Sequence, residues 1–275
     1  MRNKNSANII AQDSSKVMYE NLLPHEFIQR INECPIAYVP LGTLEWHAKH
    51  LPLGSDGIQS RGFFQRLAME IGGIVLPMLF LGPDYRYTGS DGQSYYGMDC
   101  HSFESGYPQQ LPGSAYYVEH ELFNTILDNV VRNLARAGFG IVIAHGHGPS
   151  TIAFSARKQI FSDKFHVITH TLAELGFEGD QGIMTDHAAA NETSLVMALD
   201  PQLADLSLII DDKTPVSVWG ADPREHSSAV HGSFLIEKNI DRVATALRNM
   251  LVEVPKPDLV LDFQHVKNLL GKPIS

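Results

Sequence analysis

The chain has 275 residues, 44% of them hydrophobic, so it is long enough to bury the core of one large α/β domain. A formal net charge of −10, from 21 Lys and Arg against 31 Asp and Glu, predicts no nucleic-acid partner and no binding to an anionic membrane. The sequence has no apolar run near the roughly 20 residues of a membrane span, no secretory signal pattern and no C-x-x-C pair, so we expect a cytoplasmic protein in which Cys34 and Cys100 are ordinary thiols.

The order of apolar runs predicts the fold class. Residues 1–17 are polar and predict an N-terminal tail, and residues 18–275 predict a single domain. Four apolar runs predict strands at 36–42, 73–81, 139–146 and 165–171. Helical patterns cover roughly 57–71, 115–137, 149–162, 187–199 and 239–252. Such alternation is typical of an α/β fold with a mostly parallel sheet and helices on both faces.

The segment after the first predicted strand, LGTLEWHAKHLPLGSDG, concentrates ligand-type side chains. Glu45 and His47 stand two residues apart, so in an extended segment both point to the same side. Asp56 follows after a turn rich in Pro and Gly. Carboxylate and imidazole groups at this density suit a catalytic divalent metal, although solvated polar residues in a surface loop are the alternative.

Residues 82–113 show neither helical nor strand periodicity and are rich in Gly, Tyr, Asp, Ser and Pro. An irregular stretch of this length in a compact domain is usually functional, and we expect it to form a lid over the substrate. Its polar and aromatic groups suit a polar ring-shaped ligand, and we predict that Tyr95, His101 and Glu104 bind substrate. Ordinary surface packing is the alternative for each of them.

The third predicted strand runs directly into His145, Gly146, His147 and Gly148. Ligands gather at the carboxyl ends of strands in open α/β sheets, and the two glycines allow tight turns beside a bound ion. For either histidine alone, a hydrogen bond to a nearby backbone group is an equally good interpretation.

A further cluster, TDHAAANETS at residues 185–194, precedes an apolar helical run. His187 and Glu192 are five residues apart, which is about 140° around a helix, so they share a site only if His187 precedes the regular helix. We also predict Asp186 as a substrate-binding residue. A capped helix with exposed charges is the alternative.

These motifs together resemble those of the creatininase family of metal-dependent amidohydrolases. The opening E-x-H-x8-D pattern of Glu45, His47 and Asp56 is the most specific part. Later segments resemble family motifs in the same order, namely LPGS at 111–114, HGHGPS around His147, HAAANETS at 187–194 and GADP at 220–223. The resemblance covers roughly residues 36–234.

The resemblance implies a three-layer α/β/α sandwich with one or two divalent metals, zinc first and manganese or iron as alternatives. Glu45, Asp56 and His147 would bind one metal, and His47 and Asp56 the second, with Asp56 bridging. The creatinine-hydrolysing members complete the second site with a Glu two residues after the glycine-flanked His, where this chain has Pro149. Glu192 is the candidate for the missing carboxylate.

The resemblance also implies catalytic roles. His187 would carry a proton to the leaving group, with Glu192 as the competing candidate if it is not a ligand. We expect a hydrolase that opens or cleaves a small cyclic amide or lactam-like carbonyl compound through metal-activated hydroxide. Creatinine itself is not expected, because Ile183 and Met184 precede His187 where a ring-stacking tryptophan would be needed.

Two alternatives remain open on the sequence. One is a ring-opening hydrolase of a cyclic polyol ketone such as a dehydro-inosose, which the polar composition of residues 82–113 favours. The other is a catalytically silent binding homologue, which Pro149 in place of a ligand leaves possible. The expected partner is a small polar cyclic substrate, and family membership implies a homo-oligomer, hexamers included.

Overall fold

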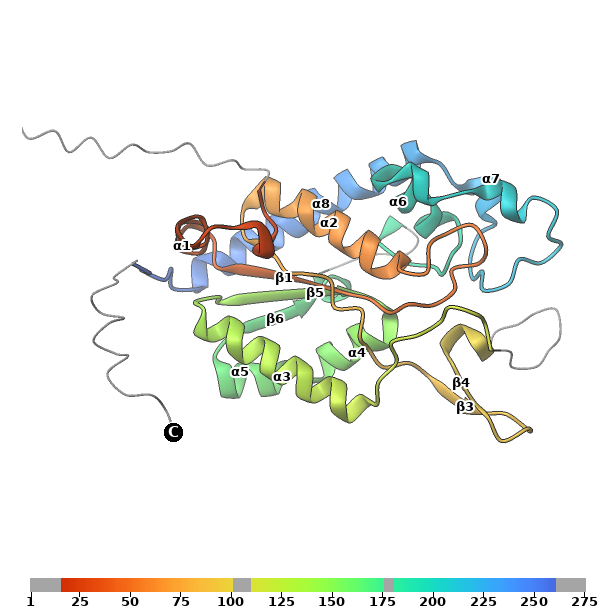
Figure 1. Cartoon of the computed structure of the whole chain (residues 1–275). Helices are drawn as coiled ribbons and strands as arrows, with labels where there is room; N and C mark the ends of the chain where they lie inside the picture. Colours follow the sequence, from red (N-terminus) through yellow and green to blue (C-terminus); the bar gives the residue numbers. More distant parts are fainter. Residues whose placement is uncertain (1–15, 101–109, 176–180, 261–275) are drawn as a thin grey trace, which may run out of the picture.

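A four-stranded parallel sheet forms the centre of the computed structural model, which describes residues 16–100, 110–175 and 181–260 (Figure 1). The strand order is β2 (Ile74–Val75), β1 (Ile36–Leu41), β5 (Ile141–Gly146) and β6 (Ile168–Thr171). β1 and β5 pair along their whole length, from Ile36 opposite Ile141 to Leu41 opposite Gly146. Both central strands are fully buried, as expected for a sheet covered on both faces.

Alternate residues of β1 enter two separate hydrophobic cores. The helices on one face of the sheet are α2 (Ser55–Ile71), α6 (Ala190–Leu199) and α8 (Ala229–Glu253), and those on the other face are α3 (His120–Arg136), α4 (Gly148–Ala156) and α5 (Lys158–Phe165). Ile36 and Tyr38 pack with α2 and α8, whereas Ala37 and Val39 pack with α3, α4 and α5. Figure 1 shows the two helical layers above and below the sheet. The predicted three-layer α/β/α fold is confirmed.

The second predicted strand was too long. Only Ile74 and Val75 form β2, because Pro77 has no N–H to donate to the ladder. The chain nevertheless continues beside β1, where the backbone N–H of Leu79 donates to the carbonyl oxygen of Pro40 at 3.0 Å.

The helix boundaries also differ from the predicted ones. The predicted helix 149–162 is two helices, α4 and α5, which meet at Arg157. The helix predicted at 239–252 begins ten residues earlier, at Ala229, where the Ser228 hydroxyl caps it by accepting from the backbone N–H of His231. Helices α1 (Pro24–Glu33) and α7 (Pro223–His226) were not predicted.

Residues 82–113 are more regular than the sequence indicated. They contain an antiparallel hairpin of β3 (Arg86–Thr88) and β4 (Ser94–Tyr96), which Figure 1 places at the end of the molecule toward which β1 and β5 run. The predicted tail lies outside the described residues up to residue 15, and Val17, at its end, is buried in the first core.

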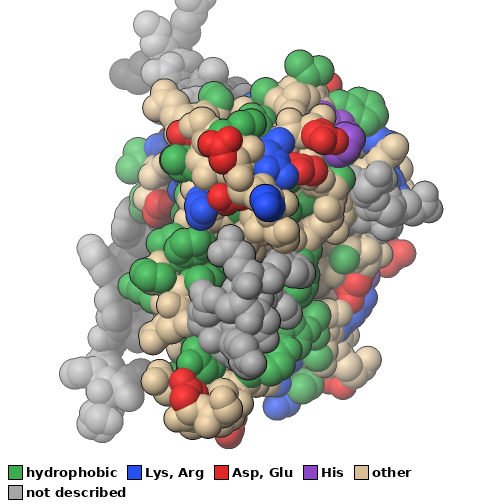
Figure 2. All heavy atoms as spheres, turned by 90° about the vertical axis from the view of Figure 1, so that its right-hand side faces the viewer, with side chains coloured by type: hydrophobic (Ala, Val, Ile, Leu, Met, Phe, Trp, Pro, Cys, Tyr) green, Lys and Arg blue, Asp and Glu red, His purple; other side chains and the backbone are tan. Residues whose placement is uncertain are grey.

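The surface at the hairpin end of the molecule is mixed in character. Figure 2 shows that, outside the grey atoms, acidic and basic side chains lie there among apolar ones without a broad patch of one charge.

In the described parts of the chain, every helix is too short or too polar to cross a membrane.

Helices α6 and α8 approach so closely that Gly232 is required at their crossing. A Cβ at this position would overlap the carbonyl group of Ser194 on α6. We expect Gly232→Ala to lower the free energy of unfolding by about 1–3 kcal/mol through overpacking, although alanine is the better helix former by about 1 kcal/mol. Denaturant unfolding measures this change.

Gly148→Ala is the control for that variant, because a Cβ at Gly148 would have no other atom within 4 Å. It should leave the free energy of unfolding nearly unchanged. A Gly232→Ala protein as stable as the parent would contradict the close helix crossing.

Candidate metal centre

The segment after β1 is held by hydrogen bonds to backbone carbonyl groups of two neighbouring segments, and Glu45 and His47 lie in the interior. The N–H of Glu45 donates to the carbonyl oxygen of Leu53 at 3.0 Å, and the indole N–H of Trp46 donates to the carbonyl oxygen of Pro112 at 2.8 Å. Glu45 and His47 are 2% and 0% exposed. Two polar side chains buried to this degree require partners.

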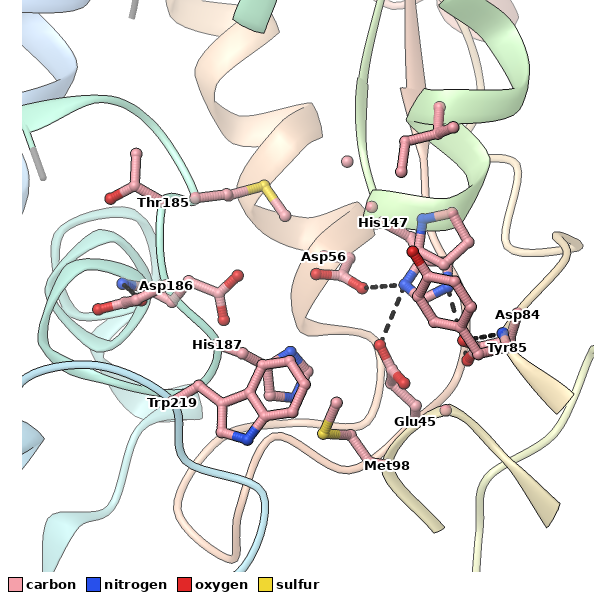
Figure 3. A pocket seen from close by; sticks show the side chains of 17 residues that line it. Glu45, Asp56, Asp84, Tyr85, Met98, His147, Thr185, Asp186, His187 and Trp219 are labelled. Atoms are coloured by element: carbon pink, nitrogen blue, oxygen red, sulfur yellow. Dashed lines mark hydrogen bonds and ion pairs between the residues drawn. The ribbon is translucent and has the colours of Figure 1, made fainter. Parts of the chain in front are cut away.

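Asp56, in the first turn of α2, is the shared partner of two histidines. Its Oδ1 lies 3.2 Å from Nε2 of His47, and its Oδ2 lies 3.1 Å from Nδ1 of His147. The same Nδ1 of His147 is 3.0 Å from Oε1 of Glu45. Figure 3 shows Glu45, Asp56 and His147 pointing toward one another. The predicted residues after β1 and β5 therefore meet at one point.

Gly146 explains how His147 reaches this point. The chain turns sharply after β5 with φ +139° at Gly146, and a Cβ there would overlap the carbonyl oxygen of Leu41. Only glycine adopts this conformation at such close approach. His147 then stands immediately before α4, and the residue is 4% exposed.

A second group of ligand-type atoms lies on the other side of Asp56. Oε2 of Glu192 is 3.6 Å from Nε2 of His47, and it also accepts the backbone N–H of Ala188 at 2.8 Å. The ligand atoms of His47, Asp56 and Glu192 all lie within 4.8 Å of one another, as do those of Glu45, Asp56 and His147. Two metal-sized clusters thus share Asp56.

The buried charges of these clusters fit metal ions. Burial would lower the pKa of both histidines, but the facing carboxylates outweigh it, raising the pKa of His47 to about 10 and that of His147 well above its usual range. Burial raises the pKa of Glu192 to about 8. Oε2 of Glu45 and Nε2 of His147 are buried without a hydrogen-bond partner. Excess negative charge and unpaired donor atoms are what a divalent cation would satisfy.

His187 precedes the regular helix, as its spacing from Glu192 required, because α6 begins at Ala190 and Ala188 has φ +50°. Its ring stacks on that of His47 with 4.3 Å between centroids, and its Nε2 lies 3.0 Å from the carbonyl oxygen of Trp46. Burial, with the charge of His47, lowers the pKa of His187 to about 4. The imidazole of His187 is therefore neutral at pH 7.

Asp186 serves the helix next to it. Its two carboxylate oxygens accept the backbone N–H groups of Asn191 at 2.7 Å and Glu192 at 3.0 Å. The first turn of α6 is thus capped, but its charges are not exposed as that alternative required, since Glu192 is 2% exposed, and Asp186 also lines the cavity described below. Its role toward substrate remains a prediction.

His145 makes the hydrogen bond to a backbone group that was the alternative to metal binding. Its Nε2 lies 3.1 Å from the carbonyl oxygen of Ile183, and burial lowers its pKa to about 4. His145 belongs to neither ligand cluster among the described residues. It is a core histidine, while His147 faces the two carboxylates.

The clusters open into a cavity of about 390 Å³. Besides the clustered residues, its lining includes Asp84, Tyr85 and Met98 from the 82–113 stretch and Trp219 from the segment that pairs with His187. Tyr95, predicted to bind substrate, is not in the lining, and its hydroxyl group donates to Asp91 at 2.7 Å on the hairpin, so its role toward substrate stays a prediction. The other two predicted residues of this stretch, His101 and Glu104, lie outside the described residues.

Asp84 is the functional candidate that the sequence analysis missed. It is 9% exposed, and its Oδ2 lies 3.6 Å from Nε2 of His147. Burial, with the charge of Glu45, raises the pKa of Asp84 to about 7. No spacing links Asp84 to the other ligand-type residues, and its place after Gly82 and Pro83 gives only a turn signal.

Known proteins resemble this chain in sequence and in fold. The family model described as creatininase, creatinine amidohydrolase, matches residues 20–245. The creatinine amidohydrolase of Pseudomonas putida is 24% identical over 271 residues, covering 86% of this chain and 97% of that protein. A crystal structure of creatinine amidohydrolase is similar with a TM-score of 0.64 and 21% identity over 85% of this chain and 97% of that one. A manganese creatininase is similar with a TM-score of 0.61 and 21% identity over 85% and 98%.

The raised histidine pKa values predict that the metal-free protein loses stability as the pH rises. A group whose folded pKa is above its unfolded value stabilises the fold fully below the unfolded pKa, and this contribution disappears through the folded pKa. For His47 the window runs from 6.5 to about 10, and Glu192 acts in the same direction between 4.5 and about 8. Denaturant unfolding of the metal-free protein across this window should show a falling free energy of unfolding.

His47→Gln should flatten that decline, because it removes a group whose folded pKa, about 10, lies well above its unfolded value of 6.5. A metal-free protein whose stability is constant or increases from pH 7 toward 10 would contradict the proposed charge balance of the two clusters.

Proposed function

This chain belongs to the creatininase family, and on that premise we propose that it hydrolyses a small cyclic amide or lactam-like carbonyl compound with one or two bound divalent metals. The observation that carries the proposal is the position of Asp56. Its two oxygens face two histidines of different clusters, at 3.2 and 3.1 Å. A carboxylate held in this way is suited to bridge two cations.

The donor set assigns residues to each metal position. Glu45, Asp56 and His147 would hold one ion, and His47, Asp56 and Glu192 the other. Oxygen and nitrogen donors accept zinc, manganese and iron, and solved relatives described as a zinc–zinc creatininase mutant and a manganese creatininase favour the first two. When bound, such an ion supplies a water molecule whose pKa is lowered from 15.7 to about 7.

Pro149 does not leave the second position without a carboxylate. Pro149 lines the cavity and offers no ligand atom, but Glu192 lies 3.6 Å from Nε2 of His47 from the opposite side. This arrangement supports the hydrolase over a silent binding homologue, since a buried acidic cluster without a function is costly to maintain.

His187 is the residue best placed to move a proton. Its Nε2 donates to the carbonyl oxygen of Trp46, so its Nδ1 carries the lone pair. The low pKa keeps the ring neutral and able to accept a proton at Nδ1. The indole of Trp219 packs edge to face against the imidazole of His187, with 6.3 Å between the ring centroids, and helps to fix the orientation of the imidazole. Glu192, hydrogen-bonded at Ala188 and facing His47, is better suited to be a ligand.

The cavity lining restricts the charge of the substrate. Its described residues include neither Lys nor Arg, whereas Asp84, Asp186 and the ligand carboxylates are acceptors. Away from the metal positions, a free carboxylate or phosphate group would therefore lack a Lys or Arg side chain to pair with. Neutral compounds rich in N–H or O–H donors fit this lining.

The same lining supports a second candidate, the ring opening of a cyclic polyol ketone. Hydroxyl groups of such a compound can donate to Asp186 and to the hydroxyl oxygens of Tyr85 and Thr185, which also line the cavity. The reaction would break a C–C rather than a C–N bond at the same centre. A homo-oligomer and a cytoplasmic location remain part of the proposal.

Glu45→Gln tests the metal-dependent reaction. The substitution keeps the shape of the side chain but removes the charge that faces His147. We expect less bound metal by elemental analysis and a loss of hydrolytic activity greater than the roughly 10–100-fold that follows loss of an outer-shell partner. Glu70→Gln is the control, because Glu70 is an exposed partner of Arg248. Full metal content and full activity in Glu45→Gln would refute the proposal.

A substrate panel separates the two reactions and tests the charge restriction. Neutral lactams and cyclic amides, neutral inososes, and carboxylated or phosphorylated analogues of each are incubated with the metal-loaded protein, and products are identified by mass spectrometry. We expect turnover of one neutral class and at least ten-fold less of its anionic analogues, about 1.4 kcal/mol. Preference for an anionic analogue would contradict the restriction to neutral substrates inferred from the cavity lining.

A further inference from the structure

His147 presents its two ring nitrogens to different carboxylates. Nδ1 faces Glu45 and Asp56 at 3.0 and 3.1 Å, and Nε2 faces Oδ2 of Asp84 at 3.6 Å (Figure 3). Both Nε2 and this Oδ2 are buried without a hydrogen-bond partner. The pair is therefore an unmade contact between a nitrogen and an acceptor in the interior.

The chain holds Asp84 rigidly in this place. Its Oδ1 accepts the backbone N–H of Tyr85 at 2.7 Å, which orients the carboxylate. Gly97, at the end of the hairpin, has φ +49°, and its N–H donates to the carbonyl oxygen of Tyr85 at 2.9 Å. A Cβ at Gly97 would overlap Oδ2 of Asp84. The hairpin thus closes directly over the carboxylate.

The tautomer of a metal-binding histidine determines whether Nε2 carries a proton and needs a hydrogen-bond acceptor. When Nδ1 binds a metal it must carry the lone pair, so the ring proton is on Nε2. A buried N–H without an acceptor has lost its hydrogen bond to water with nothing in its place, which is unfavourable. Asp84 is the carboxylate on that side, and its Oδ2, 3.6 Å away, would accept from Nε2–H if the two atoms approached to about 3.2 Å or less.

We propose that Asp84 is the positioning residue of His147, accepting a hydrogen bond from Nε2–H and thereby directing Nδ1 toward Glu45 and Asp56. This inference rests on the proposed metal centre. It assigns a role to a residue of the 82–113 stretch, outside the motifs from which the site was predicted. The hairpin would then contribute to metal affinity as well as to the shape of the cavity.

Two substitutions test the role of Asp84, with zinc affinity measured by competition with a chelator. Asp84→Ala removes the acceptor, and we expect zinc to bind about 10–100-fold more weakly at unchanged stoichiometry. Asp84→Asn retains an amide oxygen that can still accept from Nε2–H, so its loss should be smaller. This partial rescue distinguishes an acceptor from a residue that only fills space.

The tautomer supplies a second readout. In the zinc-loaded protein labelled with ¹⁵N-histidine, NMR should show the proton of His147 on Nε2, and Asp84→Ala should expose that proton to faster exchange with water. The His147 signals are assigned by their absence in His147→Gln.

Asp99→Asn is the matched control. Asp99 is a buried carboxylate of the same stretch, 4% exposed, which accepts the backbone N–H of Leu111 at 2.9 Å and does not line the cavity. It should leave zinc affinity and the His147 signals unchanged. An equal loss in Asp99→Asn would overturn the proposal in favour of a general effect on the fold of this stretch.

The remaining outcomes separate this inference from the proposed function. Unchanged affinity in Asp84→Ala, with zinc bound by the parent protein, would refute the role of Asp84 alone. Loss of one equivalent of zinc in that variant would make Asp84 a ligand and also overturn the positioning role. A parent protein that binds no zinc, manganese or iron would refute the proposed function and this inference together.

Discussion

The arrangement of the site depends on one buried carboxylate, that of Asp56, shared between His47 and His147. A charge buried at this depth is tolerated only when it is paired on every side. Without metal, the pairing is achieved by protons on the two imidazoles, which is why their pKa values are raised. With metal, two cations would take the place of those protons. The affinity for metal and the pH dependence of the metal-free protein's stability therefore have the same cause, because metal ions and protons neutralise the same buried carboxylates.

The fold brings the residues that pair with Asp56 together because the strands before them end at the same edge of the sheet. β1 and β5 run in the same direction, so the residues that follow them meet. The chain is bent sharply around the site, since Ala48, Met184, Ala188 and Ser217 all have positive φ without being glycine. Such conformations cost of order 1–3 kcal/mol each and persist where the surrounding structure enforces them. Of these residues, Ala188 lies directly after His187 and four residues before Glu192, and both of those side chains line the cavity.

Features that depend on spacing along the chain could be predicted from the sequence. The order of apolar runs predicted a mostly parallel sheet with helices on both faces, and short-range patterns brought Glu45, His47 and Asp56 together as ligand candidates. Predictions failed where a local pattern was compatible with two structures. Pro77 shortened a strand that looked continuous, and the hairpin within 82–113 is too short and too exposed to show an alternation of apolar residues.

The sequence by itself determined which residue types are available and which of them are neighbours along a strand or turn, because covalent spacing and glycine conformations are local properties. Only the tertiary structure decided among chemically equivalent residues. It directed His147 to the carboxylates and His145 to a backbone carbonyl, and it brought Asp84 to His147 while Tyr95 remained on the hairpin. Those choices depend on which side of each element is buried against which other element, and contacts between residues distant in sequence leave no periodic signal in a single chain.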